Sequence, residues 1–216
     1  MLDFGFYNMD CMDGMKEFPD KYFDLAIVDP PYGIENAFNA TSRISKYGDA
    51  KIVNDRKPNN LYFKELFRVS KNQVIWGYNH LSDMLPTTKE FIFWYKHNPV
   101  KTYSDGELAW TSYKKTAHCF DYPYFGNIGL DYGKRIHPTQ KPVALYDWIL
   151  SKYAKKGDKI IDTHVGSASS LIACRKNGFD YVGFELDEYY YNLAKKRLDN
   201  YSAQMNIFDF IGEKKT

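Results

Sequence analysis

A carboxylate, two prolines and an aromatic ring stand together in the tetrapeptide Asp29-Pro30-Pro31-Tyr32. The tetrapeptide follows the apolar run 25–28, which is typical of a buried strand. Ligands of open α/β sheets bind at the carboxyl ends of such strands. An acceptor-rich turn beside an aromatic face suits a planar group with an exocyclic amine, such as a base lifted out of a duplex. A proline-rich turn with a solvated Asp is the alternative for this tetrapeptide taken alone.

A second candidate site is the turn Asp162-Thr163-His164-Val165-Gly166-Ser167, which follows another predicted strand. Gly166 would let the backbone approach a ligand closely. Glu185 stands at the end of the next predicted strand, where an acid can hydrogen-bond two ribose hydroxyls. The turn lacks the full Gly-x-Gly-x-x-Gly pattern, which favours a nucleoside without phosphates, such as S-adenosylmethionine. The alternative is an ordinary βα turn whose glycine only relieves crowding.

Hydrophobic periodicity supplies the elements that must position these residues. It predicts strands at 4–10, 25–28, 73–76, 91–95, 107–113, 159–162 and 181–185. It predicts helices at 12–18, 60–69, 82–85, 142–153 and 169–176, and a last helix from Asp187 to about Asn200. The alternation of strand and helix in the final third implies parallel strands with right-handed crossovers. Residues 34–58 resemble a long polar loop, and 212–216 a frayed tail.

Composition bounds the class of protein. With 216 residues, 44% hydrophobic and 26% charged, the chain is expected to form one soluble globular domain. A net charge of +2 permits nucleic-acid binding through local patches without requiring it. We see no signal peptide and no apolar run near the roughly 20 residues that span a bilayer, so a cytoplasmic protein is expected. The cysteines and histidines have no disulfide or metal-ligand spacing, and no metal is expected.

Taken together, these motifs resemble the amino-group DNA methyltransferases, which methylate adenine N6 or cytosine N4. Asp29-Pro30-Pro31-Tyr32 matches the family signature, and 162–170 resembles its cofactor turn, usually Asp-Pro-Phe-x-Gly-Ser-Gly. Residues 183–190 are similar to the strand and ribose-binding acid that follow. Residues 137–142 resemble the segment before the cofactor half, and 8–11 the short motif whose acid meets the cofactor adenine. The catalytic half comes first, as in the beta class, which includes many phage and restriction-modification enzymes.

The resemblance implies a doubly wound, mostly parallel seven-stranded sheet of the S-adenosylmethionine-dependent, Rossmann-like type, circularly permuted, in a single methyltransferase domain over 1–216. It implies that Asp29 and the Pro30 carbonyl accept hydrogen bonds from the target amine, within a turn completed by Pro31, and that Tyr32 stacks on the extruded base. The expected cofactor-binding residues are Asp10, Cys11, Asp29, Thr139, Lys141, Asp162, Thr163, His164, Gly166, Ser167, Glu185 and Leu186. Lys141 would either pair with the cofactor carboxylate or be a surface charge.

Two departures from the family pattern stand in the cofactor turn. Thr163-His164 replaces the usual Pro-Phe, and Ala168 replaces the second glycine. We expect altered cofactor packing there rather than loss of binding.

DNA is the expected partner, and a homodimer is common in this class. Small recognition insertions are expected within 34–58 and 96–135, and a solvated charged surface is the alternative for both. The basic residues that suggest them are Arg43, Lys46, Lys51, Arg56, Lys57, Lys101, Lys114, Lys115, Lys134 and Arg135. Asp in the first signature position favours adenine N6. The open alternatives are an N4-cytosine enzyme, an RNA N6-adenine methyltransferase and a non-catalytic DNA-binding relative.

Overall fold

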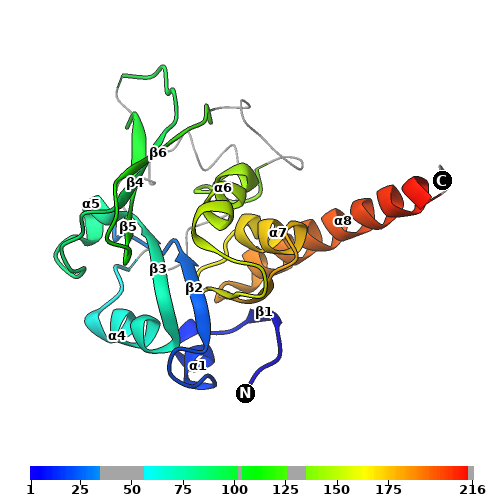
Figure 1. The fold of residues 1–216 in the computed structure, drawn as a ribbon, viewed down its shortest axis with the longest axis horizontal. Helices are drawn as coiled ribbons and strands as arrows, with labels where there is room; N and C mark the ends of the chain where they lie inside the picture. Colours follow the sequence, from blue (N-terminus) through cyan, green and yellow to red (C-terminus); the bar gives the residue numbers. More distant parts are fainter. Residues whose placement is uncertain (35–55, 102–103, 126–134, 214–216) are drawn as a thin grey trace.

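An eight-stranded sheet runs through the molecule (Figure 1). The computed structural model describes residues 1–34, 56–101, 104–125 and 135–213, the last ten of these as helix backbone alone. The strands are β1 (Gly5–Asn8), β2 (Phe23–Val28), β3 (Ser70–Trp76), β4 (Phe91–Tyr95), β5 (Gly106–Thr111), β6 (His118–Asp121), β7 (Lys159–Asp162) and β8 (Asp180–Glu185). Their order is β1-β8-β7-β2-β3-β5-β4-β6. Only β5 runs antiparallel to its neighbours among these strands.

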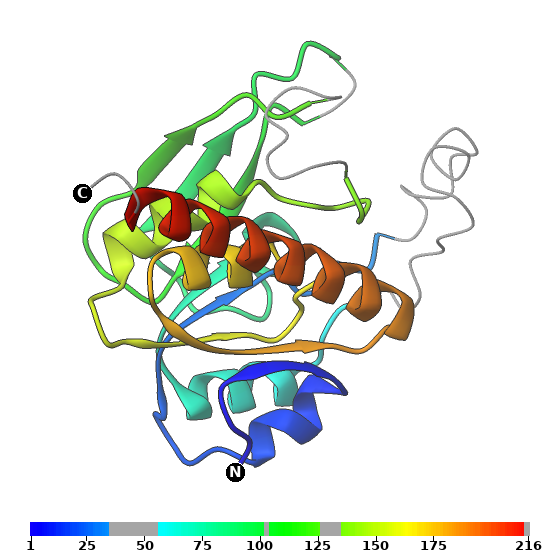
Figure 2. The same ribbon diagram turned by 90° about the vertical axis from the view of Figure 1, so that its right-hand side faces the viewer.

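Helices cover both faces of the sheet. One face carries α1 (Cys11–Lys16), α4 (Asn60–Val69) and α5 (Tyr78–Leu81), and the other carries α6 (Val143–Tyr153), α7 (Ser169–Lys176) and α8 (Glu188–Glu213). Figure 2 shows β8 between α7 and α8 on one side and α1 on the other. In the described part of the chain, no helix has the length and apolar character needed to cross a membrane.

The core consists of two apolar layers, one on each side of the sheet. Leu25 and Ile27 of β2 pack in the layer formed with α6 and α7, whereas Ala26 and Val28 pack in the layer formed with α1 and α4. Successive side chains of a strand point to opposite faces, so a strand covered on both sides must be apolar throughout. This explains why residues 25–28 of β2 form an uninterrupted apolar run, whereas Asp24, near the start of the strand, is partly exposed and pairs with Lys71.

The predicted fold class is confirmed, and several elements have the predicted bounds, among them α4, β4, β7 and α7. In the described residues the sheet has eight strands rather than seven, because β6, within the stretch 96–135 where only one strand was expected, pairs with β4. The last helix continues beyond Asn200 to Glu213.

The prediction of a short helix at 82–85 is wrong. The helix between β3 and β4 is α5, which ends at Leu81 and begins directly after Gly77, a residue with a φ of 79°. The left-handed backbone of Gly77 turns the chain at the end of β3 and starts the helix early. The predicted loop at 34–58 lies mostly outside the described residues, as does the end of the predicted tail.

Candidate active site

A row of four acids lines one edge of the sheet. Asp10 follows β1, Glu185 ends β8, Asp162 ends β7 and Asp29 follows β2. These four strands are neighbours and run parallel, so their carboxyl ends meet at the same edge. With about 4.8 Å between strands, the row is about 14 Å long. Residues from both ends of the chain therefore meet at one edge of the sheet. The length of the row suits a ligand made of a nucleoside and an amino acid.

The Asp29 carboxylate is hydrogen-bonded at both oxygens. The Tyr32 hydroxyl donates to Oδ1, and the Lys141 ammonium donates to Oδ2 at 2.5 Å. The Tyr32 ring stacks on His80, with centroids 5.1 Å apart and planes 17° apart, and any Cβ at Gly77 would overlap that ring. Burial and the nearby Asp29 raise the pKa of Tyr32 well above its usual value, so its hydroxyl keeps the proton that it donates.

Lys141 lies inside the protein between two carboxylates. Its side chain is only 3% exposed, and Nζ is also 3.1 Å from Oε2 of Glu107. Lys96 binds the other oxygen of Glu107. Burial by itself would raise the pKa of Glu107, but Lys141 and Lys96 lower it to about 2. The pKa of Lys141 is raised against the effect of burial by Asp29 and Glu107. Of the two interpretations of Lys141, the surface charge is therefore wrong.

The turn after β7 is fixed by its own acid. Oδ1 of Asp162 accepts the His164 amide at 3.0 Å, and Oδ2 accepts the Ser170 hydroxyl at 2.5 Å. Burial raises the pKa of Asp162 to about 7, and these two donors only partly offset the effect. Asp162 thus shapes the backbone of the turn from within the protein.

Glu185 connects the turn to the strand beside it. Its Oε2 accepts the amide of Gly166 at 2.8 Å, and its Oε1 accepts the amide of Asp187 at 3.0 Å. Gly166 has a φ of 54°, a backbone conformation that favours glycine. Each carboxylate oxygen has two lone pairs, so both keep acceptor capacity for a further donor.

The departure Thr163-His164 builds a buried polar chain. Oγ1 of Thr163 lies 2.7 Å from the Tyr62 hydroxyl on α4 and 2.9 Å from Nδ1 of His164. Burial lowers the pKa of His164 to about 4, so the imidazole is neutral near pH 7. The other departure, Ala168, has a φ of 61°, a left-handed conformation that the usual glycine would adopt without steric strain. The turn is thus tied to α4 by a hydrogen bond that a proline at position 163 could not make.

The other predicted cofactor residues lie around the same edge in different settings. Thr139 is exposed and bonded to Nδ1 of His137, and that ring lies over Gly166. Leu186 is 57% exposed, and Cys11, at the start of α1, is mostly buried. Ser167 is buried, and its carbonyl accepts from Arg197 while its hydroxyl bonds Ser169. The polar groups of Ser167 are therefore engaged with the protein itself.

Sequence reasoning missed several residues of the site, namely Glu107, Tyr62, Gly77 and His80. Nothing near Glu107 marks it in the sequence, because it is a single acid in an ordinary strand. Gly77, directly after the apolar run of β3, was the one available signal, since glycine at a strand end often marks a close approach.

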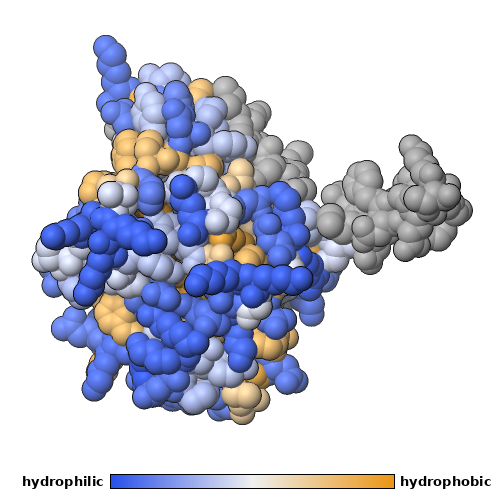
Figure 3. Space-filling model, in the orientation of Figure 1, coloured by the Kyte–Doolittle hydropathy of each residue, from blue (hydrophilic) through white to orange (hydrophobic). Residues whose placement is uncertain are grey.

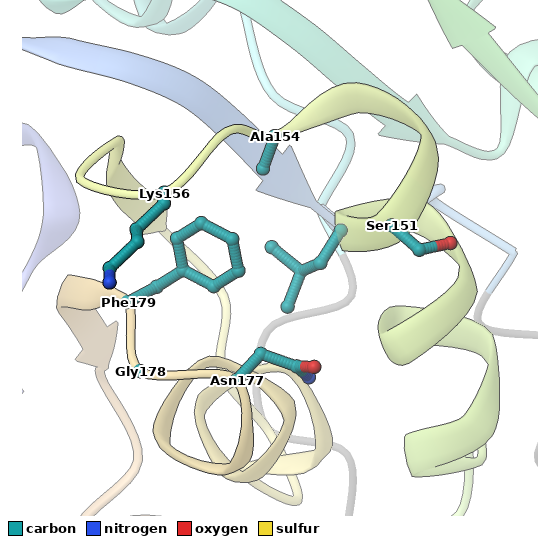
Figure 4. A pocket seen from close by; sticks show the side chains of 7 residues that line it. Ser151, Ala154, Lys156, Asn177, Gly178 and Phe179 are labelled. Carbon is teal, nitrogen blue, oxygen red and sulfur yellow. The ribbon is translucent and has the colours of Figure 1, made fainter.

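A hollow with a different lining lies away from this row of acids. A pocket between the end of α6 and the start of β8 lies at the opposite edge, where β7 and β8 begin (Figure 4). It is lined by Leu150, Ser151, Ala154, Lys156, Asn177, Gly178 and Phe179. In the described ranges, no group of three or more His, Cys, Asp or Glu side chains could hold a metal ion.

Comparison with known proteins identifies the class. The sequence profile of the N6/N4 DNA methylase family matches residues 47–196, well over half of the chain. The chain therefore belongs to this family of S-adenosylmethionine-dependent DNA methyltransferases, as its motifs predicted. The cofactor prediction is confirmed at the level of the family.

Individual relatives agree with this assignment. The chain is 26% identical to the type II methyltransferase M2.MboI of Moraxella bovis, over 90% of this chain and 87% of that protein. Among solved structures, the complex of M1.HpyAVI with S-adenosylmethionine is 26% identical, with a TM-score of 0.57 over 89% of this chain and 98% of that one. The cytosine-N4-specific PvuII DNA methyltransferase shares the fold at 12% identity and a TM-score of 0.59, over 95% of this chain and 92% of that one.

Proposed function

We propose that this protein transfers a methyl group to the exocyclic amine of an extruded DNA base, adenine N6, in a short specific site. One observation carries the proposal. Strands β2 and β7 pair in parallel, with Leu25 opposite Ile160 and Ala26 opposite Ile161. The turn that holds Asp29 and Tyr32 therefore emerges beside the turn that holds Asp162 and Gly166, and a donor and an acceptor bound to the two turns would meet.

The cofactor half of the edge fits S-adenosylmethionine. Glu185 keeps unused lone pairs for ribose hydroxyls, and Gly166, packed against the His137 ring, gives the turn the left-handed backbone that directs its amide to Glu185. Asp10 caps α1 by accepting the Met12 amide at 2.7 Å, which leaves its second oxygen for the adenine end. S-adenosylmethionine supplies a methyl group on a positively charged sulfur, ready for transfer. Cys11, Leu186, Thr139, Thr163 and His164 would form the walls, and Asp162 and Ser167 would hold the shape of the turn.

The base half would act on the target amine. The lone pair of an adenine amine is delocalised into the ring, which makes the amine a poor nucleophile. Hydrogen bonds from that amine to Asp29 and to the Pro30 carbonyl would draw the nitrogen toward tetrahedral geometry and stabilise the positive charge that develops on it. Tyr32 would stack on the base, within a turn made rigid by Pro30 and Pro31. Much of the rate would come from alignment of the reacting atoms.

The adenine assignment rests on Asp29 as the first residue of the signature. An N4-cytosine enzyme is the second candidate, because the PvuII methyltransferase shares the fold. An RNA methyltransferase and a non-catalytic relative are less favoured, since the family is one of DNA methylases and Asp29 and Tyr32 are both present.

DNA contacts are proposed from the loops at the same edge as the acids. The antiparallel register of β5 puts the loop before it, with Lys101, at that edge, and puts Lys114 and Lys115 at the opposite edge. Arg135 stacks on Tyr124, 4.3 Å from its ring centroid. Figure 3 shows mostly hydrophilic side chains on the face in view, which suits a polar partner. Most of 34–58 lies outside the described residues, and a homodimer remains a prediction.

Transfer of a labelled methyl group from S-adenosylmethionine to unmethylated duplex DNA tests the proposal directly. Nucleoside analysis of the product should recover N6-methyladenine. Recovery of N4-methylcytosine alone would reject the adenine assignment. Labelling of structured RNA in preference to DNA would show that DNA is not the substrate. Absence of transfer both to DNA that contains all short sites and to structured RNA would leave only the non-catalytic relative.

A further inference from the structure

We infer that Glu107 is a positioning residue for the methyl transfer, which acts on Asp29 through Lys141. The inference rests on the proposed function, since it concerns the readiness of Asp29 to accept the target amine. Glu107 lies on β5, and no motif of the sequence points to it.

The geometry is a chain of alternating charges. Lys96 binds one oxygen of Glu107, Lys141 lies 3.1 Å from the other oxygen, and the same ammonium lies 2.5 Å from Oδ2 of Asp29. The side chain of Lys141 is almost fully buried, and that of Asp29 is 16% exposed. Buried ionic groups need close partners to offset the loss of water, and each charge in this chain has an oppositely charged neighbour. The contact between Lys141 and Oε2 of Glu107 is an ion pair without a hydrogen bond, so it is the looser of the two contacts of Lys141.

Lys141 alone would compete with the substrate for Asp29. Its ammonium holds Oδ2 and the Tyr32 hydroxyl holds Oδ1, so each oxygen of Asp29 already has one donor before a base arrives. A lysine with Asp29 as its only anionic partner would remain bound to Oδ2. Its positive charge would then weaken the attraction between the Asp29 carboxylate and the target amine. Glu107 gives the ammonium a second partner, so Lys141 can shift toward β5 while Asp29 turns to the amine.

The surroundings of Lys141 restrict where its ammonium can go. Nζ lies 5.4 Å from the ring centroid of Trp76, whose indole is fully buried below it. The ammonium also has three donors and no acceptor. With the indole on one side, its described anionic partners are Asp29 and Glu107. Glu107 therefore decides how strongly Lys141 holds Asp29.

A double-mutant cycle separates this role from a merely structural one. The variants are Glu107→Gln, Lys141→Met and the pair together. Glu65→Gln, which breaks an ion pair with Arg68 on α4, is the matched control. We expect Glu107→Gln to lower kcat about tenfold or more, with KM for DNA and the Kd of S-adenosylmethionine within about twofold. In the Lys141→Met background, the same change should alter kcat less than about twofold, because its route to Asp29 is gone.

Three results would overturn the inference. The first is an unchanged kcat in Glu107→Gln, and the second is an equal loss in both backgrounds. The third is a loss that accompanies weaker cofactor binding and a lower melting temperature. Should Glu107→Gln not fold, Glu107→Asp keeps the charge with a shorter reach, and wild-type kcat in that variant would reject the role. If the wild-type protein transfers no methyl group to DNA, the proposed function is wrong, and the role of Glu107 is not the cause of the failure.

Discussion

Nζ of Lys141 lies 2.5 Å from Oδ2 of Asp29, although the two residues are 112 positions apart in the chain. The contact joins the segment before the cofactor half to the tetrapeptide of the catalytic half. Removal of one partner from a buried ion pair leaves an uncompensated charge, so each partner constrains the other. The acid proposed to receive the target amine is thus held in place before any substrate binds.

Replacement of Asp29 separates chemistry from cofactor binding. Asp29→Asn keeps the shape but removes the charge that would stabilise the developing positive amine. We expect methyl transfer to fall at least about 100-fold. Cofactor affinity, measured by calorimetry, should stay within about tenfold. Activity close to wild type would show that another acid receives the amine.

Gly77 is predicted to keep Tyr32 in position. A Cβ at this residue would overlap the Tyr32 ring, and the φ of 79° favours glycine. Gly178→Ala is the matched control, because Gly178 has a φ of 71° and an added Cβ there would meet nothing within 4 Å. Both variants should lose about 1–2 kcal/mol of unfolding free energy from the backbone strain. Only Gly77→Ala should also lose methyl transfer, by about tenfold or more, and equal activities would contradict the role of Gly77.

Glu185 is predicted to act on the cofactor and not on the base. Glu185→Gln replaces a desolvated carboxylate, which burial gives a raised pKa, with an amide that accepts at only one atom. We expect the Kd of S-adenosylmethionine to rise about tenfold or more, with kcat at saturating cofactor reduced much less. Glu188→Gln, on the exposed side of α8, should change neither quantity. A loss of kcat alone would assign Glu185 a different role.

Asp162 should make stability depend on pH. Burial raises its pKa from 3.8 to about 7, so the folded state binds a proton that the unfolded state has already released within this window. The free energy of unfolding contributed by this group therefore falls as pH rises from about 4 to about 7. Relative to wild type, Asp162→Asn should gain stability across that window by at most about 4 kcal/mol.

Urea unfolding of wild type and Asp162→Asn between pH 4 and pH 8 measures this difference. The comparison removes the opposite contribution of His137 and His164, whose pKa values burial lowers to about 4 in both proteins. A difference between the two proteins that does not change with pH would contradict the buried state of Asp162.

The sequence by itself determined the class of the protein and most of its elements. Asp29-Pro30-Pro31-Tyr32 and the turn at 162–167 are local motifs, and local backbone geometry with a strand before each is enough to recognise them. The apolar run of β2 and the helical spacing of α4 and α7 are likewise written in consecutive residues.

Only the tertiary structure decided how distant residues meet. The order β1-β8-β7-β2 brings Asp10, Glu185, Asp162 and Asp29 to one edge, and β5 carries Glu107 to within 3.1 Å of Lys141. The short helix after Gly77 and the strand β6 were likewise set by packing against the sheet rather than by periodicity. The physical reason is that pairing and burial act between residues far apart in the chain, whereas periodicity reports only on neighbours.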